Sequence, residues 1–544
     1  MEMPDTWFDP EGLDTETLEL SVALSLSVAR ELGIPGMIDD ACEFDKSQRK
    51  LTPGMAAMAI MGTMFTCNQK DALRNVRVFY SGSPVDRLFG PRVDKAALND
   101  MALGRSMDSI FDAGAEDLFC SIASRVKFNL GLSSPVYHVD PSNITICRSP
   151  GDEYEGVPEG APIPKLGKPK DGSEGRVQYN FVASTDGDGM PALMMPYDGN
   201  VDDTRMISEA VRKLESLMGD ERIVAVGDSK LVTKDLVAHM AARGTLFVSK
   251  PQMSFDADVK HKVAREALGH GFTPMGRIGT KGSSPEIEAY ETVRTSYGIP
   301  LRYIAYRRTD RSKVVRHMRR LDEKRMRDMV TSMSHKSFGT EQEAIEAHKR
   351  AMKELGTSTF AANPTYRSRR SPSGGTEWKV SYKPVFDADY AERLASEKVE
   401  VLVTNIPDGE DNPDDPRDGA STKGILRIYF GQWHIEGLFG ELKSGMGADK
   451  VFLESPSREA AMLFLMSVAA LVRYVIRHRL GREYGRGLGI PKRITAHRMY
   501  TLLQNVDVDF DRESGRLRLA GSPEDREAAM RYIQALAVDP STLI

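Results

Sequence analysis

The sequence predicts an α/β protein: a mixed sheet flanked by helices, interrupted by a strand-containing insertion and preceded by an all-α N-terminal region. Two observations predict this class. Short apolar runs typical of strands alternate with amphipathic helical stretches between residues 132 and 250, which is the pattern of an α/β layer. Before residue 131 there is no such alternation, and apolar residues recur at the three- and four-residue steps of helices.

The first 131 residues are therefore predicted to form a helical N-terminal region. Thr52 and Pro53 are a favoured N-cap and first-turn pair, and they precede an apolar run that extends to Phe65. Residues 103–126 repeat apolar side chains on one helical face. These patterns indicate helices that pack against one another.

Residues 132–250 are predicted to form the first part of the core. Residues 222–227 are continuously apolar, as expected of a parallel strand buried on both faces, and Asp228 follows directly. Asp140 ends the first strand of this region. The predicted strands cover 135–140, 176–184, 190–195, 222–227 and 245–249, with helices over 203–217 and 233–242.

The remaining chain is predicted to hold three further regions. Residues 251–400 form an insertion in which strand-like pieces, such as 301–306 and 376–382, surround basic helical stretches. Residues 401–480 complete the core with a strand over 399–405, an acidic loop over 408–418 and helices over 422–446 and 455–478. Residues 481–544 form a C-terminal tail of mixed structure.

Composition excludes several classes of protein. The 544 residues carry a formal net charge of −5, which excludes a uniformly basic nucleic-acid binder. Cys42, Cys67, Cys120 and Cys147 form no C-x-x-C pair, so neither a zinc ribbon nor a disulfide scaffold is supported. The N-terminus has no signal pattern, and the longest apolar run, 460–472, is shorter than the ~20 residues of a membrane span. We expect a cytoplasmic protein.

Three carboxylates are candidates for metal binding: Asp140, Asp228 and Glu436. A continuous helix would place Glu436 on one polar stripe, about 60° wide, together with Tyr429, Gln432 and Lys443. Each carboxylate also has a structural interpretation, as a turn residue, a helix N-cap or a member of a salt-bridged surface helix. Together, two Asp at the ends of sheet strands and a Glu from a packed helix form the oxygen ligand set of hard divalent cations. Two such ions can activate a hydroxyl and stabilise the leaving oxygen of a phosphodiester.

The sequence resembles the DDE transposases of bacterial insertion sequences, in the Tn-five-like group whose third carboxylate lies in a Y-x2-R-x3-E-x6-K motif. Gln432 stands where that motif has Arg. The matching segments are Tyr429, Glu436 and Lys443 of the motif, Asp140-Pro-Ser142 as D-x-[TS], Gly199-Asn200-Val-Asp-Asp203 as G-N-x-x-D, Val224 to Asp228 as the strand of the second Asp, and Leu402 to Asn405 as the strand before the third motif.

This resemblance implies an RNase H-like core and transposition with two Mg²⁺ ions, for which Mn²⁺ can substitute, held by Asp140, Asp228 and Glu436. It implies that Tyr429, Gln432 and Lys443 contact DNA near the scissile phosphate, and that the helical N-terminal region binds DNA ends. The implied partners are terminal inverted repeats, target DNA and a second copy of the chain in a synaptic homodimer. The alternatives are an RNase H-like nuclease without strand transfer and a catalytically inactive DNA-binding derivative.

Two segments concentrate positive charge. Residues 302–327 carry eleven Lys or Arg against three acids, and residues 473–498 carry eight against one. Runs of nearly one sign favour contacts with phosphates, although a solvated helix face is the common alternative. Trp378 is a candidate for stacking on a flipped base, with core packing as the alternative. The predicted DNA contacts of the first segment are Arg307, Arg308, Arg311, Lys313, Arg316, Arg319 and Arg320.

Overall fold

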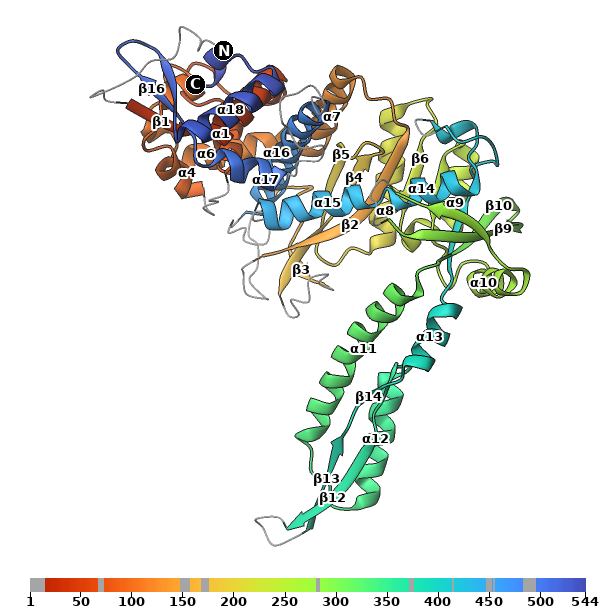
Figure 1. Ribbon diagram of the computed structural model, residues 1–544. Helices are drawn as coiled ribbons and strands as arrows, with labels where there is room; N and C mark the ends of the chain where they lie inside the picture. The colour runs from red at the N-terminus through yellow and green to blue at the C-terminus, as the bar shows by residue number, and fades with distance from the viewer. Residues whose placement is uncertain are drawn as a thin grey trace. The chain divides into compact units, whose positions relative to one another are not determined.

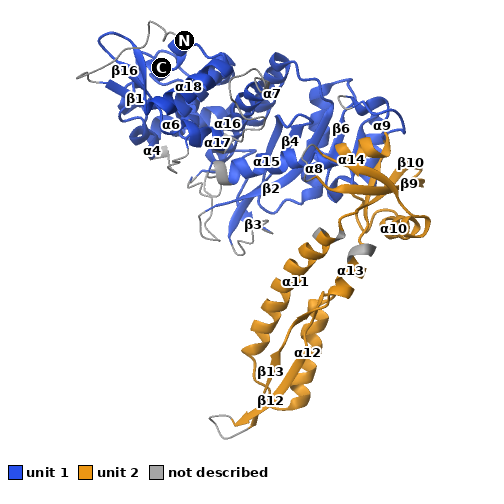
Figure 2. Cartoon of the chain, in the orientation of Figure 1, with its two compact units in different colours: residues 1–249, 406–420, 428–544 blue, residues 250–405, 421–427 orange. Residues whose placement is uncertain are grey.

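The structure is a computed structural model, and by internal contacts the chain divides into two compact units (Figure 2). Unit 1 is residues 1–249, 406–420 and 428–544, and unit 2 is residues 250–405 and 421–427. Cys67, Cys147 and residues 483–495 of the second basic segment lie outside the described residues. The structure describes residues 15–66, 73–146, 157–167, 176–279, 284–370, 376–412, 415–446, 453, 455–482 and 496–544.

The N-terminal part of unit 1 is mostly helical, but it is not all-α as predicted, because β1 (Thr15–Glu19) is a strand that pairs with a strand of the C-terminal tail. The Thr52 side chain caps the third helix by accepting a hydrogen bond from the Met55 N–H (3.2 Å). The single helix predicted over 103–126 is two helices, because the chain turns at Gly114 with a positive φ of 77°. The helices are α1 (Leu20–Glu31), α2 (Ile34–Ala41), α3 (Pro53–Gly62), α4 (Leu73–Phe79), α5 (Val85–Phe89), α6 (Asp100–Asp112) and α7 (Ala115–Leu130).

A mixed sheet lies beside the helical part of unit 1 (Figure 1). Its strands follow the order β3-β4-β2-β6-β7, and β5 also pairs with β4. The pairs β2–β4 and β4–β5 are antiparallel, whereas β2–β6 and β6–β7 are parallel. The elements are β2 (Val136–Thr145), β3 (Lys165–Leu166), β4 (Val177–Asp186), β5 (Pro191–Tyr197), α8 (Asp203–Met218), β6 (Val224–Gly227), α9 (Lys234–Arg243) and β7 (Leu246–Ser249).

The C-terminal tail of the chain packs with the N-terminal helices rather than apart from them. Strand β1 (Thr15–Glu19) pairs with β16 (Asp507–Asp511), which pairs with β17 (Leu517–Ala520). The hydrophobic core continues through these strands and the helices of both ends of unit 1. The C-terminal helices are α16 (Pro456–Arg482), α17 (Ala496–Leu503) and α18 (Pro523–Leu536).

Helix α16 corrects the expectation that no apolar segment is long enough to cross a membrane. Among the described residues, its stretch from Pro456 to Gly481 has both the length and the composition. However, 94% of its most apolar window is buried inside the protein, against α1, α3, α6, α7, α18 and β5. It is therefore placed as a core helix of unit 1.

Unit 2 contains an antiparallel sheet and a group of helices and hairpins with small cores of its own. The sheet order is β15-β10-β9-β8. Residues 251–400 thus form well-defined helices and strands, although their sequence shows no regular alternation of apolar and polar residues. Their elements are α10 (Val259–His270), β8 (Thr273–Arg277), β9 (Glu286–Ser296), β10 (Ile299–Arg308), α11 (Arg311–Ser334), α12 (Glu341–Leu355), the paired strands β11 (Phe360–Ala361) and β14 (Val385–Phe386), the hairpin of β12 (Pro364–Arg370) and β13 (Thr376–Tyr382), α13 (Ala388–Glu397) and β15 (Glu400–Thr404).

The helix predicted over 422–446 is interrupted. It consists of α14 (Thr422–Phe430), α15 (Trp433–Gly440) and the π-turn η4 (Glu441–Gly445). At the break, the Gly431 N–H donates to the Ile428 carbonyl and the Gln432 N–H to the Tyr429 carbonyl, three residues back instead of four. Side-chain directions after residue 430 therefore differ from those of a continuous helix.

Phe181 on β4 tests how α15 is held on the sheet. Its ring is fully buried and meets the Phe439 ring of α15 edge-on, with centroids 5.6 Å apart. We expect Phe181→Ala to destabilise unit 1 by about 3–5 kcal/mol, because it removes a large buried side chain and leaves a cavity. Phe128→Ala is the control, since Phe128 is 85% exposed, and it should change stability by less than about 0.5 kcal/mol. Denaturant midpoints measure both changes. Equal midpoints for Phe181→Ala and Phe128→Ala would contradict this packing.

Candidate active site

The structure brings two of the predicted carboxylates together. In the parallel pair β2–β6, Val139 lies opposite Gly227, so the next residues, Asp140 and Asp228, follow side by side where β6 ends. Neighbouring strands are about 4.8 Å apart, so the two backbones carry their carboxylates at closely adjacent points. Asp140 lies within β2 rather than at its end, because β2 continues pairing with β4 to Thr145.

Asp228 also has the structural role that its sequence position allows. Its Oδ1 accepts a hydrogen bond from the Lys230 N–H (2.8 Å), which caps the 3₁₀ turn η2 (Ser229–Leu231). The Ser249 hydroxyl donates to its carbonyl (2.5 Å) from β7. Both Asp140 and Asp228 are half-buried. Capping and ligand binding are compatible, because a carboxylate has a second oxygen.

Helix α15 lies on the face of β2 that carries Asp140. His138 and Asp140 share that face because side chains alternate along a strand. A Cβ on Gly431 would lie 2.7 Å from His138 Nε2, and a Cβ on Gly189 would lie 2.2 Å from His434 Nδ1. The two glycines thus permit close approach of α15 to the strands. Glu436 belongs to this helix.

Two histidines at the contact between β2 and α15, His138 of β2 and His434 of α15, are held neutral. Burial lowers the pKa of His138 to about 3, with a further contribution from His434. Burial also lowers the pKa of His434 to about 4, and Arg477 adds to the shift. Their rings are 6.3 Å apart. His138 therefore fills the interior under α15.

The four residues of the predicted stripe differ in exposure. Tyr429 is buried, Gln432 and Lys443 are half-buried, and Glu436 is exposed. The break at Gly431 separates Tyr429 from the rest, and Lys443 lies in η4. Among the described residues, no three His, Cys, Asp or Glu side chains are gathered closely enough to hold a metal ion. Glu436 would have to turn toward the aspartates to complete such a group.

The Gly199–Asp203 segment is fixed to the sheet by a buried ladder of amides. The Asn143 side chain donates to Gln178, which donates to Asn180 and to the Gly199 carbonyl, at 2.9–3.2 Å. A Cβ on Gly199 would lie 1.9 Å from the Gln178 carbonyl oxygen, so only glycine fits there. Asp202 then caps α8 by accepting from the Thr204 N–H. This polar ladder was not predicted.

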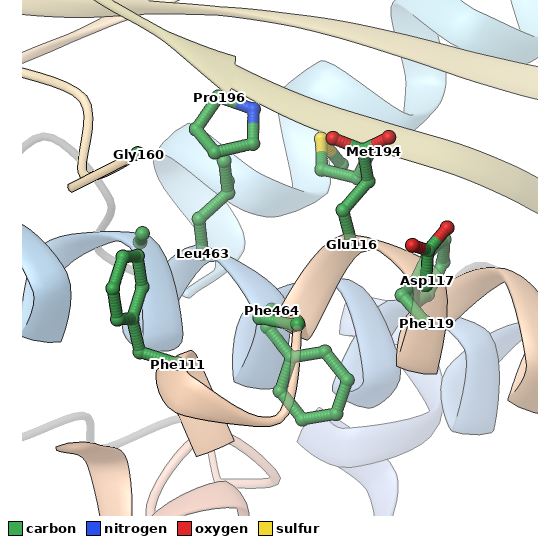
Figure 3. Close-up of a pocket in the computed structure, with 12 residues that line it drawn as sticks. Phe111, Glu116, Asp117, Phe119, Gly160, Met194, Pro196, Leu463 and Phe464 are labelled. Carbon is green, nitrogen blue, oxygen red and sulfur yellow. The ribbon is translucent and has the colours of Figure 1, made fainter. Parts of the chain in front are cut away.

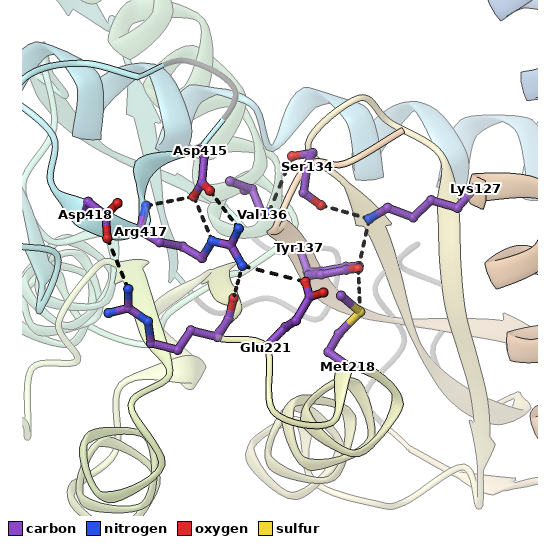
Figure 4. Close-up of polar contacts among 10 residues, drawn as sticks. Lys127, Ser134, Val136, Tyr137, Met218, Glu221, Asp415, Arg417 and Asp418 are labelled. Carbon is purple, nitrogen blue, oxygen red and sulfur yellow. Dashed lines mark hydrogen bonds and ion pairs between the residues drawn. The ribbon is translucent and has the colours of Figure 1, made fainter. Parts of the chain in front are cut away.

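An arginine cluster attaches the acidic loop to unit 1 (Figure 4). Arg417 forms a bidentate ion pair with Asp415 (2.7 and 2.8 Å) and lies 3.7 Å from Glu221. Arg222 pairs with Asp418 (3.2 Å). The loop that precedes α14 is therefore anchored to the turn between α8 and β6, which also leads to Asp228.

Exposure separates the predicted DNA contacts of unit 2 into two groups. Arg308, Arg316, Arg319 and Arg320 are exposed, whereas Arg307 is half-buried, paired with Glu288 (2.5 Å) and stacked on Phe272. The side chains of Arg311 and Lys313 lie outside the description. Trp378 is half-buried against the cluster of Met333, Ala344 and Val380. This is the core packing named above as the alternative to stacking on a flipped base.

The second basic segment is largely structural where it is described. Arg473 is buried, donates to the Met64 carbonyl and lies over the Tyr500 ring. Arg477 pairs with Glu441, and Arg479 forms a bidentate pair with Glu31 (2.7 Å). These three arginines of α16 form their contacts within unit 1, whereas the sequence favoured phosphate contacts for this segment.

Unit 1 also contains a cavity of about 310 Å³, with mixed polar and apolar walls, that sequence reasoning missed (Figure 3). Glu116 and Asp117 bring carboxylates to its wall, and both pair with Lys213 of α8. Burial raises the pKa of Glu116. No predicted site residue lines this cavity. Its lining is Phe111, Gly114, Ala115, Glu116, Asp117, Phe119, Gly160, Met194, Pro196, Ala460, Leu463 and Phe464.

Comparison with known proteins gives few matches. Residues 19–124 match the family model described as "Domain of unknown function (DUF4277)". No curated protein matches the chain. A similar solved structure is the piggyBac transposase synaptic complex with hairpin DNA, at 9% identity, covering 90% of this chain and 82% of that chain with a TM-score of 0.39. A similarity at that score does not establish a common fold or activity.

The buried carboxyl of Asp186 predicts a pH dependence of stability. Asp186 ends β4; its Oδ1 accepts from the Asp188 and Met190 N–H groups, and its Oδ2 lies 3.7 Å from Lys127 Nζ. Burial raises its pKa to about 6 in spite of Lys127. The native state therefore binds more protons than the unfolded state between about pH 4 and pH 6, and the free energy of unfolding should fall across that window and then level off.

Asp186→Asn should remove this fall, which amounts to at most about 3 kcal/mol. The amide oxygen can keep both backbone hydrogen bonds, so the variant tests the charge rather than the fold. Asp188→Asn, on the same hairpin and exposed, is the control and should keep the fall. Denaturant titrations at pH 4, 5, 6 and 7 measure the effect. Identical pH profiles for Asp186→Asn and the parent would contradict the assignment.

Proposed function

We propose that this protein is a DDE transposase that cleaves DNA at the ends of a mobile element and joins them to target DNA. Unit 1 would be its RNase H-like core, and Asp140, Asp228 and Glu436 its catalytic carboxylates. The observation that carries the proposal is the adjacency of Asp140 and Asp228 where the parallel strands β2 and β6 part. A mixed sheet with carboxylates at the ends of its parallel strands is a common location of sites in α/β proteins.

The donor set fits divalent cations by its chemistry. Three carboxylates supply only hard oxygen ligands, which suit Mg²⁺ and Mn²⁺. Asp140 and Asp228 are half-buried and stand on adjacent strands, and the exposed Glu436 belongs to the helix over the same face of β2. Glu436 completes the set when its side chain turns toward the aspartates. Two bound ions would activate the attacking hydroxyl and stabilise the leaving oxygen of the phosphodiester.

Residues near Glu436 would position DNA. Lys443 carries a point charge suited to a phosphate, and its π-turn places it one turn beyond α15. Gln432 supplies neutral hydrogen bonds where the resembled family has an arginine fork, so its contact with phosphate is weaker. Tyr429 is buried, so it would either pack in the interior or reach DNA only through its hydroxyl group. Water and then a 3′-OH would be the nucleophiles, so no covalent enzyme intermediate forms.

The proposed partners are terminal inverted repeats, target DNA and a second copy of the chain. On α11 the exposed Arg316, Arg319 and Arg320 lie at i, i+3 and i+4, so they share one face of the helix. This face gives unit 2 a concentrated positive charge for phosphates. Paired cleavage at two ends would be served by a homodimer.

The catalytic assignment predicts the loss of both reactions on single substitutions. Asp140→Asn, Asp228→Ala and Glu436→Ala should each reduce cleavage and strand transfer at least 1000-fold, because the charge that holds the ions is lost. Glu410→Gln, in the exposed acidic loop, is the control and should leave both rates unchanged. The assay uses linear DNA that carries the sequences flanking the gene, with Mg²⁺, Mn²⁺ or EDTA.

Two outcomes would contradict this function. Activity that survives Asp228→Ala and Glu436→Ala would exclude these carboxylates. Cleavage without joining of pre-cut 3′-OH ends would support a nuclease in place of a transposase.

The α11 face predicts a change in the salt dependence of DNA binding. Arg316→Glu with Arg320→Glu should weaken binding and lower the slope of log K against log salt by about 2, because about 0.9 of slope is lost per phosphate contact. Arg516→Glu reverses an exposed charge in unit 1 and should change neither quantity beyond error. Fluorescence anisotropy from 50 to 300 mM salt measures both. An unchanged slope would mean that this face of α11 does not contact DNA phosphates.

A further inference from the structure

The β12–β13 hairpin of unit 2 has one packed face and one open face. Tyr366, Trp378 and Val380 lie on the packed face, against α11 and α12. The open face carries the opposing pairs Arg369–Glu377, Arg367–Lys379 and Thr365–Ser381. On it, Thr365, Arg367, Arg369 and Ser381 are exposed, and Glu377 and Lys379 are half-buried. We call these six residues the ribbon face.

Two positive charges stand directly opposite each other on the ribbon face. Arg367 and Lys379 are cross-strand partners, and such partners have Cβ atoms about 4.5–5.5 Å apart. Like charges in this arrangement destabilise a hairpin. Among the described residues neither has an acidic partner within ion-pair distance, whereas Arg369 pairs with Glu377 (3.4 Å). The fold alone does not account for this unneutralised pair.

We propose that the ribbon face binds the phosphates of duplex DNA. Phosphates would relieve the repulsion between Arg367 and Lys379, and the hydroxyls of Thr365 and Ser381 are of the kind that donate to phosphate oxygens. A two-stranded ribbon also has the width to enter the major groove. The inference rests on the proposed DNA substrate and adds a contact surface apart from the α11 face and the carboxylates.

The opposite side of the same module provides a matched control. Ala344, His348 and Leu355 of α12 point inward, so Lys349 and Lys353, which are exposed, point away from the hairpin. Reversing two charges there changes the net charge of unit 2 by the same amount as reversing two on the ribbon face. Only the position of the charges differs between the two variants.

The experiment measures binding to duplex DNA by fluorescence anisotropy, in the full chain that carries Asp228→Asn to prevent turnover. Arg367→Glu with Lys379→Glu should weaken binding roughly tenfold or more and lower the salt slope by about 2. Lys349→Glu with Lys353→Glu should leave the slope unchanged. The single variant Arg367→Glu places opposite charges across the strands, so it should keep the hairpin folded while lowering the slope by about 1.

Two results would overturn the inference: an unchanged slope in the ribbon variants, or an equal loss of binding in the α12 control. These results are separable from a failure of the proposed catalysis. Binding is measured without turnover, so the ribbon face can be correct while the carboxylates are wrong, and the reverse.

Discussion

The parallel pairing of β2 with β6 is the constraint on which the rest of the candidate site depends. Its register places Val139 opposite Gly227 and so sets Asp140 beside Asp228. A shift of one residue would turn one carboxylate to the opposite face of the sheet. The antiparallel pairing with β4 holds β2 itself in one register from Tyr137 to Thr145, so only β6 could shift.

Glycines place backbone and helices close to this pair of strands. Gly431, Gly189 and Gly199 each stand where a Cβ would meet a neighbouring atom at 2.7 Å or less. At Gly431 the neighbour is the buried His138 of β2, and at Gly189 it is the half-buried His434 of α15, so α15 lies close both to β2 and to the segment of Gly189. At Gly199 the neighbour is the backbone of β4, which fixes the segment before α8. In each case the glycine is required by close packing.

Much of this arrangement could be predicted from the sequence, because local patterns carry it. The alternation of strands and helices from β2 to β7 follows from periodicity, and Asp228 follows a continuously apolar strand. Long-range features could not be predicted. The pairing of β1 with β16 joins residues almost 500 positions apart, and no local pattern reports it. The break between α14 and α15 lies at Gly431, which approaches His138 only in the folded chain.

The role of a charged side chain is the property that the sequence predicted least well. The segments 302–327 and 473–498 look alike as runs of Lys and Arg, yet their described side chains do different things. On α16, Arg473, Arg477 and Arg479 face carbonyls and carboxylates of unit 1, and they are buried or half-buried. On α11, Arg316 and Arg320 face solvent. The difference comes from the neighbours: α16 is surrounded by core, and its arginines reach polar groups at the edge of that core. Helix α11 packs its methionine side against the small cores of unit 2, and Arg319 and Arg325 of α11 also contact the protein, over the Phe386 ring and at Asp322. Arg316 and Arg320 are exposed, so their charge is available to an anionic partner.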